Sequence, residues 1–309
     1  MITFVQLEYI IALDTYRHFH TAADKCFVTQ PTLSMQVKKL ESDLGLLLFD
    51  RSQQPVKPTK AGTKIIEQAR ILLRQRDKIQ DIIQEQKKSI EGTVKIGIIP
   101  SLAPYLLPLF IGNLTQNNPL LKVEIQELIT EKIEEQLLND QLDIGILETP
   151  LRNKKIEEQP IFYEEILVYP NKNHAFAKRK SIQTSEISLP DVWLLNHGHC
   201  FSHQVLNLCQ TKEEQSNLPF LYKSGSLETL KNLVDKEGSF TLLPALAVDS
   251  SMQDRVIHFQ DIMPLREVSL VYARSFSKTQ ILKTLKSEIT QAIPKEMLNK
   301  NRGTIVEWK

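Results

Sequence analysis

The chain of 309 residues is 41% hydrophobic and 24% charged, and its formal net charge at pH 7 is +1. A chain of this length is expected to form two or three domains, and its near-neutral charge excludes a protein that is a polycation over its whole surface. Its 3 cysteines are too few for the disulfide framework of a small secreted domain. Because no basic segment precedes an apolar run at the start, no signal peptide is predicted, and the expected location is the cytoplasm.

Charge is spread unevenly along the chain. Residues 1–92 hold 14 Lys and Arg against 11 Asp and Glu, and the remainder holds 24 against 26, which alone is only a weak indication of a nucleic-acid partner. Residues 96–121 are uncharged and long enough to span a bilayer, but this stretch contains Pro100, Pro104 and Pro108. A strand, a turn and a helix are expected there, and no membrane partner is predicted.

Helical spacing and capping residues predict three short helices in the first part of the chain. The first covers residues 3 to about 15, since Leu7 and Ile10 recur on one face. Thr21 is expected to cap the second helix and Thr29 the third, because a threonine hydroxyl accepts a hydrogen bond from a free N–H group at a helix start. Cys26 lies in the apolar pattern and is expected in the core.

The third predicted helix has one apolar and one polar face. Leu33, Val37 and Leu40 share the apolar face, and amide, hydroxyl and ammonium groups occupy the other. Such groups bond base edges in the major groove of DNA, glutamine to adenine and serine or threonine to several bases. The residues of this helix predicted to contact DNA are Gln30, Thr32, Ser34, Gln36, Lys38 and Lys39.

A hairpin wing is predicted after the third helix. Two short strands, LLFDR and VKPT, flank a turn at residues 52–55. Basic side chains here are expected to bind phosphates, which positions a protein on DNA without reading its sequence. These side chains are Arg51, Lys57 and Lys60. From the pattern alone, any three-helix domain with a polar surface is an equal alternative.

The residues that fill this pattern resemble the LysR-type transcriptional regulators. The matching stretches are AADKCFVTQPTLSMQVKKLESDLGLLLFDR and PTKAG, with one departure at Gln54, where many members carry a second basic residue in the wing. The resemblance implies an all-α winged helix-turn-helix DNA-binding domain over residues 1–59. It also implies double-stranded promoter DNA and RNA polymerase as partners.

Residues 60–88 contain no proline and predict one long helix. Its seam positions recur in steps of four and three, with one polar break, at Ile65, Ala69, Leu72, Arg76, Ile79 and Ile83. This spacing is typical of a coiled coil, although a long helix packed on its own domain is the alternative. The LysR resemblance implies a linker helix and hinge over residues 60–92 that pairs two chains, and a homotetramer built as a dimer of dimers.

From residue 93 onward, strand and helix patterns alternate, which predicts parallel sheet with crossover helices. Two such α/β units, with a late strand LVYA that returns to the first, predict a two-lobed regulatory domain over residues 93–309. The LysR resemblance implies the same periplasmic-binding-protein-like (type 2) sensor fold. Ser101, after the first strand, and Thr130, at the second helix, are candidates for a cleft between the lobes, or else are helix caps.

The segment HGHCFSHQVLNLC carries Cys200 and Cys209, nine positions apart. In a helix this spacing puts the two thiols on opposite faces, so a disulfide would require a different backbone. Phe201, Val205 and Leu208 would form the apolar stripe of that helix. Four interpretations stay open: thiols in a core, a zinc site with the neighbouring histidines, a Cys–His nucleophile for acyl transfer, and a redox switch.

Longer stretches of the chain resemble the hydrogen-peroxide-sensing members of the LysR family. These stretches are IPSLAPYLLP, WLLN, GHC followed by eight residues and a second cysteine, and SGSLETLKNLVDKEGSFTLLPALAV. The resemblance implies that Cys200 is the peroxidatic cysteine and Cys209 the resolving cysteine. It also implies that Ser101, Thr130 and His199 shape a peroxide pocket.

The function implied by the resemblance is a transcription regulator and not an enzyme, with no metal or other cofactor. Peroxide would oxidise Cys200 to a sulfenic acid, and Cys209 would close a reversible disulfide that changes the transcription of antioxidant genes. A glutaredoxin- or thioredoxin-type reductant would reset it. The alternatives are a LysR-type regulator with a metabolite in the cleft and passive cysteines, and a thiol peroxidase. One departure from the peroxide-sensing pattern is Ala273, where an arginine is usual and where Arg274 follows one position later.

Overall fold

The computed structural model describes residues 2–87, 90–187, 191–195, 200–209, 218, 220, 222, 225–274, 276 and 278–307; for residues 77, 78, 80, 81, 83–87, 200 and 209 it describes the backbone only. The chain divides into two compact units, Met1–Lys88 with Ser275–Thr279, and Ser89–Arg274 with Gln280–Lys309. Within the described part of the chain, no helix combines the length and hydropathy that a membrane crossing requires.

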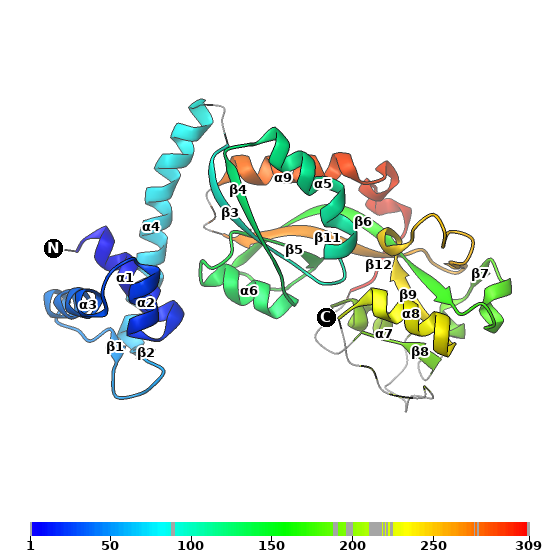
Figure 1. Cartoon of the computed structure of the whole chain (residues 1–309), viewed down its shortest axis with the longest axis horizontal. Helices are drawn as coiled ribbons and strands as arrows, with labels where there is room; N and C mark the ends of the chain where they lie inside the picture. Colours follow the sequence, from blue (N-terminus) through cyan, green and yellow to red (C-terminus); the bar gives the residue numbers. More distant parts are fainter. Residues whose placement is uncertain are drawn as a thin grey trace. The chain divides into compact units, whose positions relative to one another are not determined.

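The N-terminal unit is a helix-turn-helix followed by a two-stranded wing and a long helix (Figure 1). Its elements are α1 (Phe4–Tyr16), α2 (Phe19–Lys25), α3 (Gln30–Leu44), β1 (Phe49–Asp50), β2 (Lys57–Pro58) and α4 (Lys60–Lys87). Apolar side chains from all four helices meet in one core, where Ile10, Leu33 and Leu40 are fully buried. Cys26 is partly buried against this core, as expected, and burial raises the pKa of its thiol.

The starts of these helices agree with the sequence prediction in one case and correct it in another. Thr29 caps α3, where its hydroxyl accepts the backbone N–H of Thr32 at 3.4 Å. The prediction that Thr21 caps the second helix is wrong, because α2 already begins at Phe19 with His18 at its N-cap. The left-handed residue Arg17 (φ 59°) ends α1 and redirects the chain at once, so the next helix begins earlier than expected.

The C-terminal unit is built on an eight-stranded sheet in the order β4-β3-β5-β11-β6-β9-β8, with β12 paired to β11. Its strands are β3 (Gly92–Ile98), β4 (Leu121–Glu127), β5 (Ile144–Thr149), β6 (Ile156–Pro170), β8 (Val192–Trp193), β9 (Phe240–Pro244), β11 (Pro264–Ala273) and β12 (Thr304–Ile305). A separate parallel pair joins β7 (Ser181–Ile182) and β10 (His258–Phe259).

Helices follow the strands as the alternating pattern predicts. They are α5 (Ala103–Asn117), α6 (Thr130–Leu138), α7 (Cys200–Cys209), α8 (Leu227–Glu237) and α9 (Thr279–Ala292), with 3-10 turns η1 (Ala175–Lys178), η2 (Thr184–Glu186), η4 (Ala245–Ala247), η5 (Lys295–Leu298) and η6 (Lys300–Arg302). β3 pairs in parallel with both β4 and β5. Gly145 on β5 lets α6 lie close to the sheet, because a Cβ there would be 2.6 Å from a methyl carbon of Ile133.

The two lobes of this unit share one long strand. β6 pairs with β11 through residues 156–165 and with β9 through residues 166–170, antiparallel in both cases. Figure 1 shows β6 and β11 leaving the first-lobe sheet together toward β9. The predicted LVYA strand is part of β11, which also pairs with β5, so its return to the first lobe is confirmed.

Helix α7 packs onto the core of the second lobe. Phe201, Val205 and Leu208 are 2%, 1% and 6% exposed, which confirms the predicted apolar stripe. They share one buried cluster with Trp193 and Leu230. Burial of each such side chain is worth about 1.5–3 kcal/mol relative to exposure, so this stripe anchors the helix.

Candidate functional site

Cys200 and Cys209 are the first and last residues of α7. Nine residues of α-helix rise about 13.5 Å, whereas a disulfide requires its two Cα atoms to be about 4.4–6.8 Å apart. The two cysteines therefore cannot be joined while α7 is intact, and a bond between them requires part of the helix to unwind. Their thiols and the whole of His199 lie outside the described residues.

A buried arginine lies against the first turn of α7. Arg266, on β11, is 0% exposed, and its guanidinium carbon lies 5.3 Å from the ring centroid of Phe201, the residue after Cys200. A cation over an aromatic face is worth about 2 kcal/mol where water is excluded. The fold therefore fixes a positive charge beside the start of this helix.

Each nitrogen of the Arg266 guanidinium donates a hydrogen bond to an oxygen. Nε donates to Oε1 of Glu164 at 2.6 Å, and Nη1 donates to Oε1 of Glu148 at 2.7 Å and to Oγ of Ser101 at 3.1 Å. Nη2 lies 2.6 Å from the same oxygen of Glu164 and donates to the backbone carbonyl of Ser101 at 3.3 Å. In this arrangement four hydrogen bonds and two ion pairs hold the guanidinium in place.

Two carboxylates share this one guanidinium away from water, since Glu148, Glu164 and Arg266 are each 0% exposed. Burial raises the pKa of Glu148; the charge of Arg266 offsets part of this increase, and repulsion from Glu164 adds to it. Oε2 of Glu148 is buried and has no hydrogen-bond partner among the residues that the structure describes. An unpaired ionised oxygen is very costly to bury, so the geometry favours a protonated Glu148.

Ser101 and Thr130 are both buried, at 2% and 1% exposed. The N-cap of α5 is Leu102 and that of α6 is Ile129, and neither makes a side-chain cap bond. The interpretation of Ser101 and Thr130 as helix caps is therefore wrong. Ser101 instead binds the guanidinium of Arg266, and Thr130 is the first residue of α6.

The sequence prediction missed the arginine of this site. An arginine is usual at the position of Ala273, but here Arg274 follows it and forms a surface ion pair 2.8 Å from a glutamate, with its side chain 65% exposed. The buried arginine, Arg266, comes earlier on the same strand. A signal was present, because Glu148, Glu164 and Arg266 each follow a hydrophobic residue on a strand, and a buried charge requires a partner of opposite sign.

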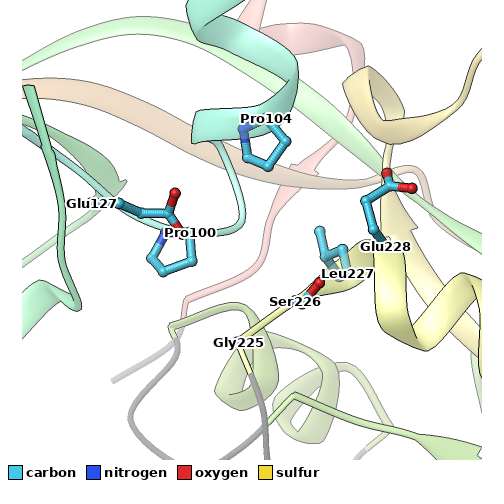
Figure 2. A pocket seen from close by; sticks show the side chains of 7 residues that line it. All are labelled: Pro100, Pro104, Glu127, Gly225, Ser226, Leu227 and Glu228. Carbon is cyan, nitrogen blue, oxygen red and sulfur yellow. The ribbon is translucent and has the colours of Figure 1, made fainter.

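A cavity of about 350 Å³ lies between the two lobes (Figure 2). Its lining residues are Pro100, Pro104, Glu127, Gly225, Ser226, Leu227 and Glu228. Figure 2 shows Glu127 and Glu228 on opposite sides of it. Neither Ser101 nor Thr130 lines this cavity, so these two cleft candidates lie outside its wall.

Helix α3 presents most of the predicted DNA-contacting residues. Gln30, Lys38 and Lys39, with Lys57 and Lys60 near the wing, are exposed, and Thr32, Ser34 and Gln36 are partly buried. Gln36 is held by α1, since its Oε1 accepts a hydrogen bond from Nε2 of Gln6 at 3.3 Å. Phe27, in the turn before α3, is 95% exposed, and the sequence analysis gave this aromatic side chain no role.

Glu41 ties α3 to the wing. Its carboxylate is buried, and Oε1 accepts the backbone N–H groups of Leu48 at 2.8 Å and Phe49 at 3.2 Å. Oε2 accepts a hydrogen bond from Arg51 at 2.7 Å. Arg51, predicted to contact phosphate, is therefore engaged within the unit and rests over the ring of Phe19.

The long helix α4 is covered by its own unit only near its start. Ala69 of the predicted seam is 2% exposed in the core, and Arg76 lies 2.6 Å from Glu8 on α1. Leu72 and Ile79, farther along the seam, are 51% and 61% exposed. The predicted seam therefore has two parts. Its first part is buried in the core of its own unit, and the described apolar side chains Leu72 and Ile79 farther along are exposed to solvent.

Two family models match the chain. The model described as bacterial regulatory helix-turn-helix protein, lysR family, matches residues 4–63, and the LysR substrate binding domain matches residues 87–293. The chain belongs to the LysR family. The first matched region contains α3 with its predicted DNA-contacting residues, and the second contains the buried Arg266 cluster.

Several LysR-family relatives are named for hydrogen peroxide. The hydrogen peroxide-inducible genes activator of Haemophilus influenzae is 35% identical over 269 residues, covering 86% of this chain and 89% of the relative. The DNA-binding transcriptional dual regulator OxyR of Escherichia coli is 36% identical over 269 residues, with 86% and 88% covered. This chain thus closely resembles OxyR regulators.

Solved structures give the same result. A full-length OxyR variant from Pseudomonas aeruginosa matches with a TM-score of 0.78 at 31% identity, covering 95% of this chain and 99% of that one. A Corynebacterium glutamicum OxyR mutant with bound H2O2 matches with a TM-score of 0.61 at 28% identity, covering 94% and 92%.

Proposed function

We propose that this LysR-family chain is a transcription regulator that responds to hydrogen peroxide through a reversible disulfide between Cys200 and Cys209. The observation that carries the proposal is their position at the two ends of one helix, in a chain whose relatives are named for induction by hydrogen peroxide. Such a helix keeps two thiols apart until an oxidant changes one of them.

The chemistry requires two thiols and one peroxide. The thiolate of Cys200 attacks one peroxide oxygen, the O–O bond breaks, and the leaving hydroxide takes a proton to become water. The thiol of Cys209 then attacks the sulfenic acid, a second water leaves and the disulfide remains. The thiols have lost two electrons and peroxide has gained them. Ser101, Thr130 and His199 are proposed to shape the pocket of the first step.

Arg266 supplies the positive charge that favours a thiolate near the start of α7. Arg266 also pairs with Glu164 and Glu148, so the protonation state of Glu148 affects the electrostatic potential at the start of α7. A direct bond from this guanidinium to sulfur or peroxide is easiest if Arg266 releases one of its present partners. The hydroxyl of Ser101 holds the longest side-chain bond in this set, at 3.1 Å, and is the partner that can leave with least loss.

The disulfide carries the signal because it demands a different backbone from α7. A ligand shifts a conformational equilibrium only by its differential free energy for the two states, and a covalent bond provides a large one. Rebuilding α7 changes the surface of the second lobe. In a dimer of dimers assembled through α4, that change alters how the DNA-binding units meet promoter DNA and RNA polymerase.

The remaining parts of the proposal follow from this chemistry. A glutaredoxin- or thioredoxin-type reductant resets the disulfide, and the regulator works in the cytoplasm, where thiols are kept reduced. Residues 1–59 bind DNA, residues 60–92 link and pair the chains, and residues 93–309 sense peroxide. The protein reacts stoichiometrically with peroxide and is not an enzyme, because a thiol peroxidase does not need a DNA-binding unit for its catalytic cycle.

The inter-lobe cavity favours a second candidate, a LysR-type regulator that binds a metabolite there while its cysteines stay passive. Glu127 and Glu228 on the cavity wall favour a cationic or hydroxyl-rich ligand over an acid. Such a ligand would protect the chain against thermal unfolding, whereas the redox proposal requires no ligand in this cavity.

Mass spectrometry of the reduced full-length protein after one equivalent of hydrogen peroxide tests the proposal. We expect the loss of two hydrogens, mapped to the peptides that contain Cys200 and Cys209. Cys26→Ser, which changes the remaining cysteine, should leave this result unaltered, and Cys209→Ser should stop at a gain of one oxygen on Cys200. Peroxide-dependent transcription that persists in Cys200→Ser would refute the mechanism.

A further inference from the structure

Residues 304–306 are bound along the start of β11. β12 pairs in parallel with the start of that strand, and Thr304 donates its N–H to the carbonyl of Met263 at 2.8 Å. Two residues later, Val306 donates to the carbonyl of Leu265 at 2.9 Å. The side chain of Val306 also packs against the second-lobe core. The last described residues are therefore a docked strand with a defined register.

Gly303 makes this docking possible. A Cβ at this position would lie 2.3 Å from the carbonyl oxygen of Met263, closer than any real contact of that kind. A side chain at residue 303 would push the following strand off β11. The sequence of this region carries no readable signal, because a glycine by itself gives no indication of the strand that it must approach.

Two side chains of α7 are bonded to this strand. Nε2 of Gln204 donates to the carbonyl of Val306 at 2.8 Å, and Nδ2 of Asn207 donates to the carbonyl of Glu307 at 2.7 Å. Gln204 and Asn207 lie three positions apart and so share one face of α7. Gln204 is 0% exposed, and a buried amide that loses its partner costs more than an exposed one.

One further contact joins this strand to the first lobe. Glu307 lies 2.6 Å from Arg152, but the two side chains are 57% and 59% exposed, so the ion pair contributes little. The bonds to α7 and the pairing with β11 are therefore the contacts that fix the strand. Figure 1 shows the end of the chain beside α7.

We propose that residues 303–307, called here the C-terminal clamp, hold α7 in its helical form. Gln204 and Asn207 are the positioning residues through which the clamp sets the peroxide dose for disulfide formation. The inference rests on the proposed function for its peroxide part only. Bringing Cys209 to Cys200 requires α7 to unwind, and the two amides cannot keep their carbonyl partners on a rebuilt backbone. Release of the clamp is therefore part of the same step.

Amide hydrogen exchange in α7 of the reduced, full-length protein tests the clamp without peroxide. A chain that ends at Ile305 keeps β12 but loses both carbonyl acceptors, and Gly303→Val displaces the strand without touching α7. We expect exchange of the α7 amides to become about tenfold faster in both variants. Exchange in α8, which packs on the same core, is the internal control for general loosening.

Asn207→Ala, made in the full-length chain and in the shortened chain, separates the clamp from intrinsic helix stability. Alanine favours a helix more than asparagine, so in the shortened chain the change should slow exchange in α7. In the full-length chain it also removes the bond to Glu307, so the two effects should differ by at least about twofold. If Asn207→Ala changes exchange in α7 equally in the full-length and the shortened chain, the clamp is overturned. The same follows if the truncation itself leaves exchange in α7 unchanged.

The second measurement is the rate at which the Cys200–Cys209 disulfide forms after a fixed dose of peroxide. We expect the shortened chain and Gly303→Val to form it several times faster than the unaltered protein, with sulfenic acid formation at Cys200 unchanged. An unchanged disulfide rate together with faster exchange in α7 would refute the regulatory role of the clamp. If no disulfide forms in any chain, the proposed function fails, and the exchange experiment still decides whether the clamp holds α7.

Discussion

Glu148→Gln tests whether Glu148 is protonated beside Arg266. Glutamine has the size of a protonated glutamate and is neutral, and its oxygen can still accept the hydrogen bond that Nη1 of Arg266 makes at 2.7 Å. If Glu148 is protonated, the substitution replaces one neutral acceptor with another and leaves Glu164 as the counter-ion of Arg266. If Glu148 is ionised, the substitution removes a charge that the cluster needs.

The pH dependence gives the sign of the expected difference. Burial raises the pKa of Glu148, so the folded protein holds this proton more tightly than the unfolded chain does. In the unfolded chain the pKa of a glutamate is about 4.3. The stability gained from this proton is fully present below the unfolded pKa and is lost as pH rises through the folded pKa. Within that window the free energy of unfolding of the unaltered protein falls, relative to the glutamine variant, by up to about 1.4 kcal/mol per pH unit.

Urea unfolding followed by circular dichroism, at pH steps from about 5 to about 9, measures this difference. We expect the stability of Glu148→Gln relative to the unaltered protein to increase with pH and then to level off above the folded pKa. Glu157→Gln is the matched control, because its side chain is 46% exposed and pairs only at the surface. A difference between Glu148→Gln and the unaltered protein that is flat, or that decreases with pH, would show that Glu148 is ionised.

Three further substitutions test other parts of the structure. Leu208→Ala removes a side chain that is 6% exposed on α7 and should lower the free energy of unfolding by about 2–4 kcal/mol in urea; a loss below about 1 kcal/mol would contradict the packing of this helix. Glu41→Gln should lower the Tm of the DNA-binding unit by weakening the bonds to the wing, and an unchanged Tm would show that the wing is held by other contacts. Ile79→Lys should weaken self-association in sedimentation experiments without altering the circular dichroism spectrum, because this side chain is 61% exposed; unchanged association would exclude this face of α4 from the dimer.

Periodic features of this chain could be predicted from its sequence, because period reports which face is buried. The stripe of Phe201, Val205 and Leu208 and the strand–helix alternation after residue 93 are both of this kind. Residue type added the cap at Thr29, which the structure confirms. The position of the two cysteines at the ends of one helix follows from the same pattern.

The buried cluster could not be predicted in the same way, because its members are far apart in the sequence. Ser101, Glu148, Glu164 and Arg266 come from different strands and loops, and only the order of strands in the sheet brings them together. The clamp has the same origin, since Gln204 bonds a carbonyl more than one hundred positions away. The prediction of a single seam on α4 was wrong for its first part, because α1 covers a face that the spacing alone assigned to a second chain.

Glu41 carries a consequence for how promoters are read. One carboxylate fastens α3, which carries the predicted DNA-contacting side chains, to the wing, so their relative position is fixed within this unit. If the proposed disulfide changes the distance between two such units, it leaves the internal arrangement of each unit unaltered. Operators of such a protein should therefore differ in their spacing preference between redox forms, while the bases preferred within each half remain the same.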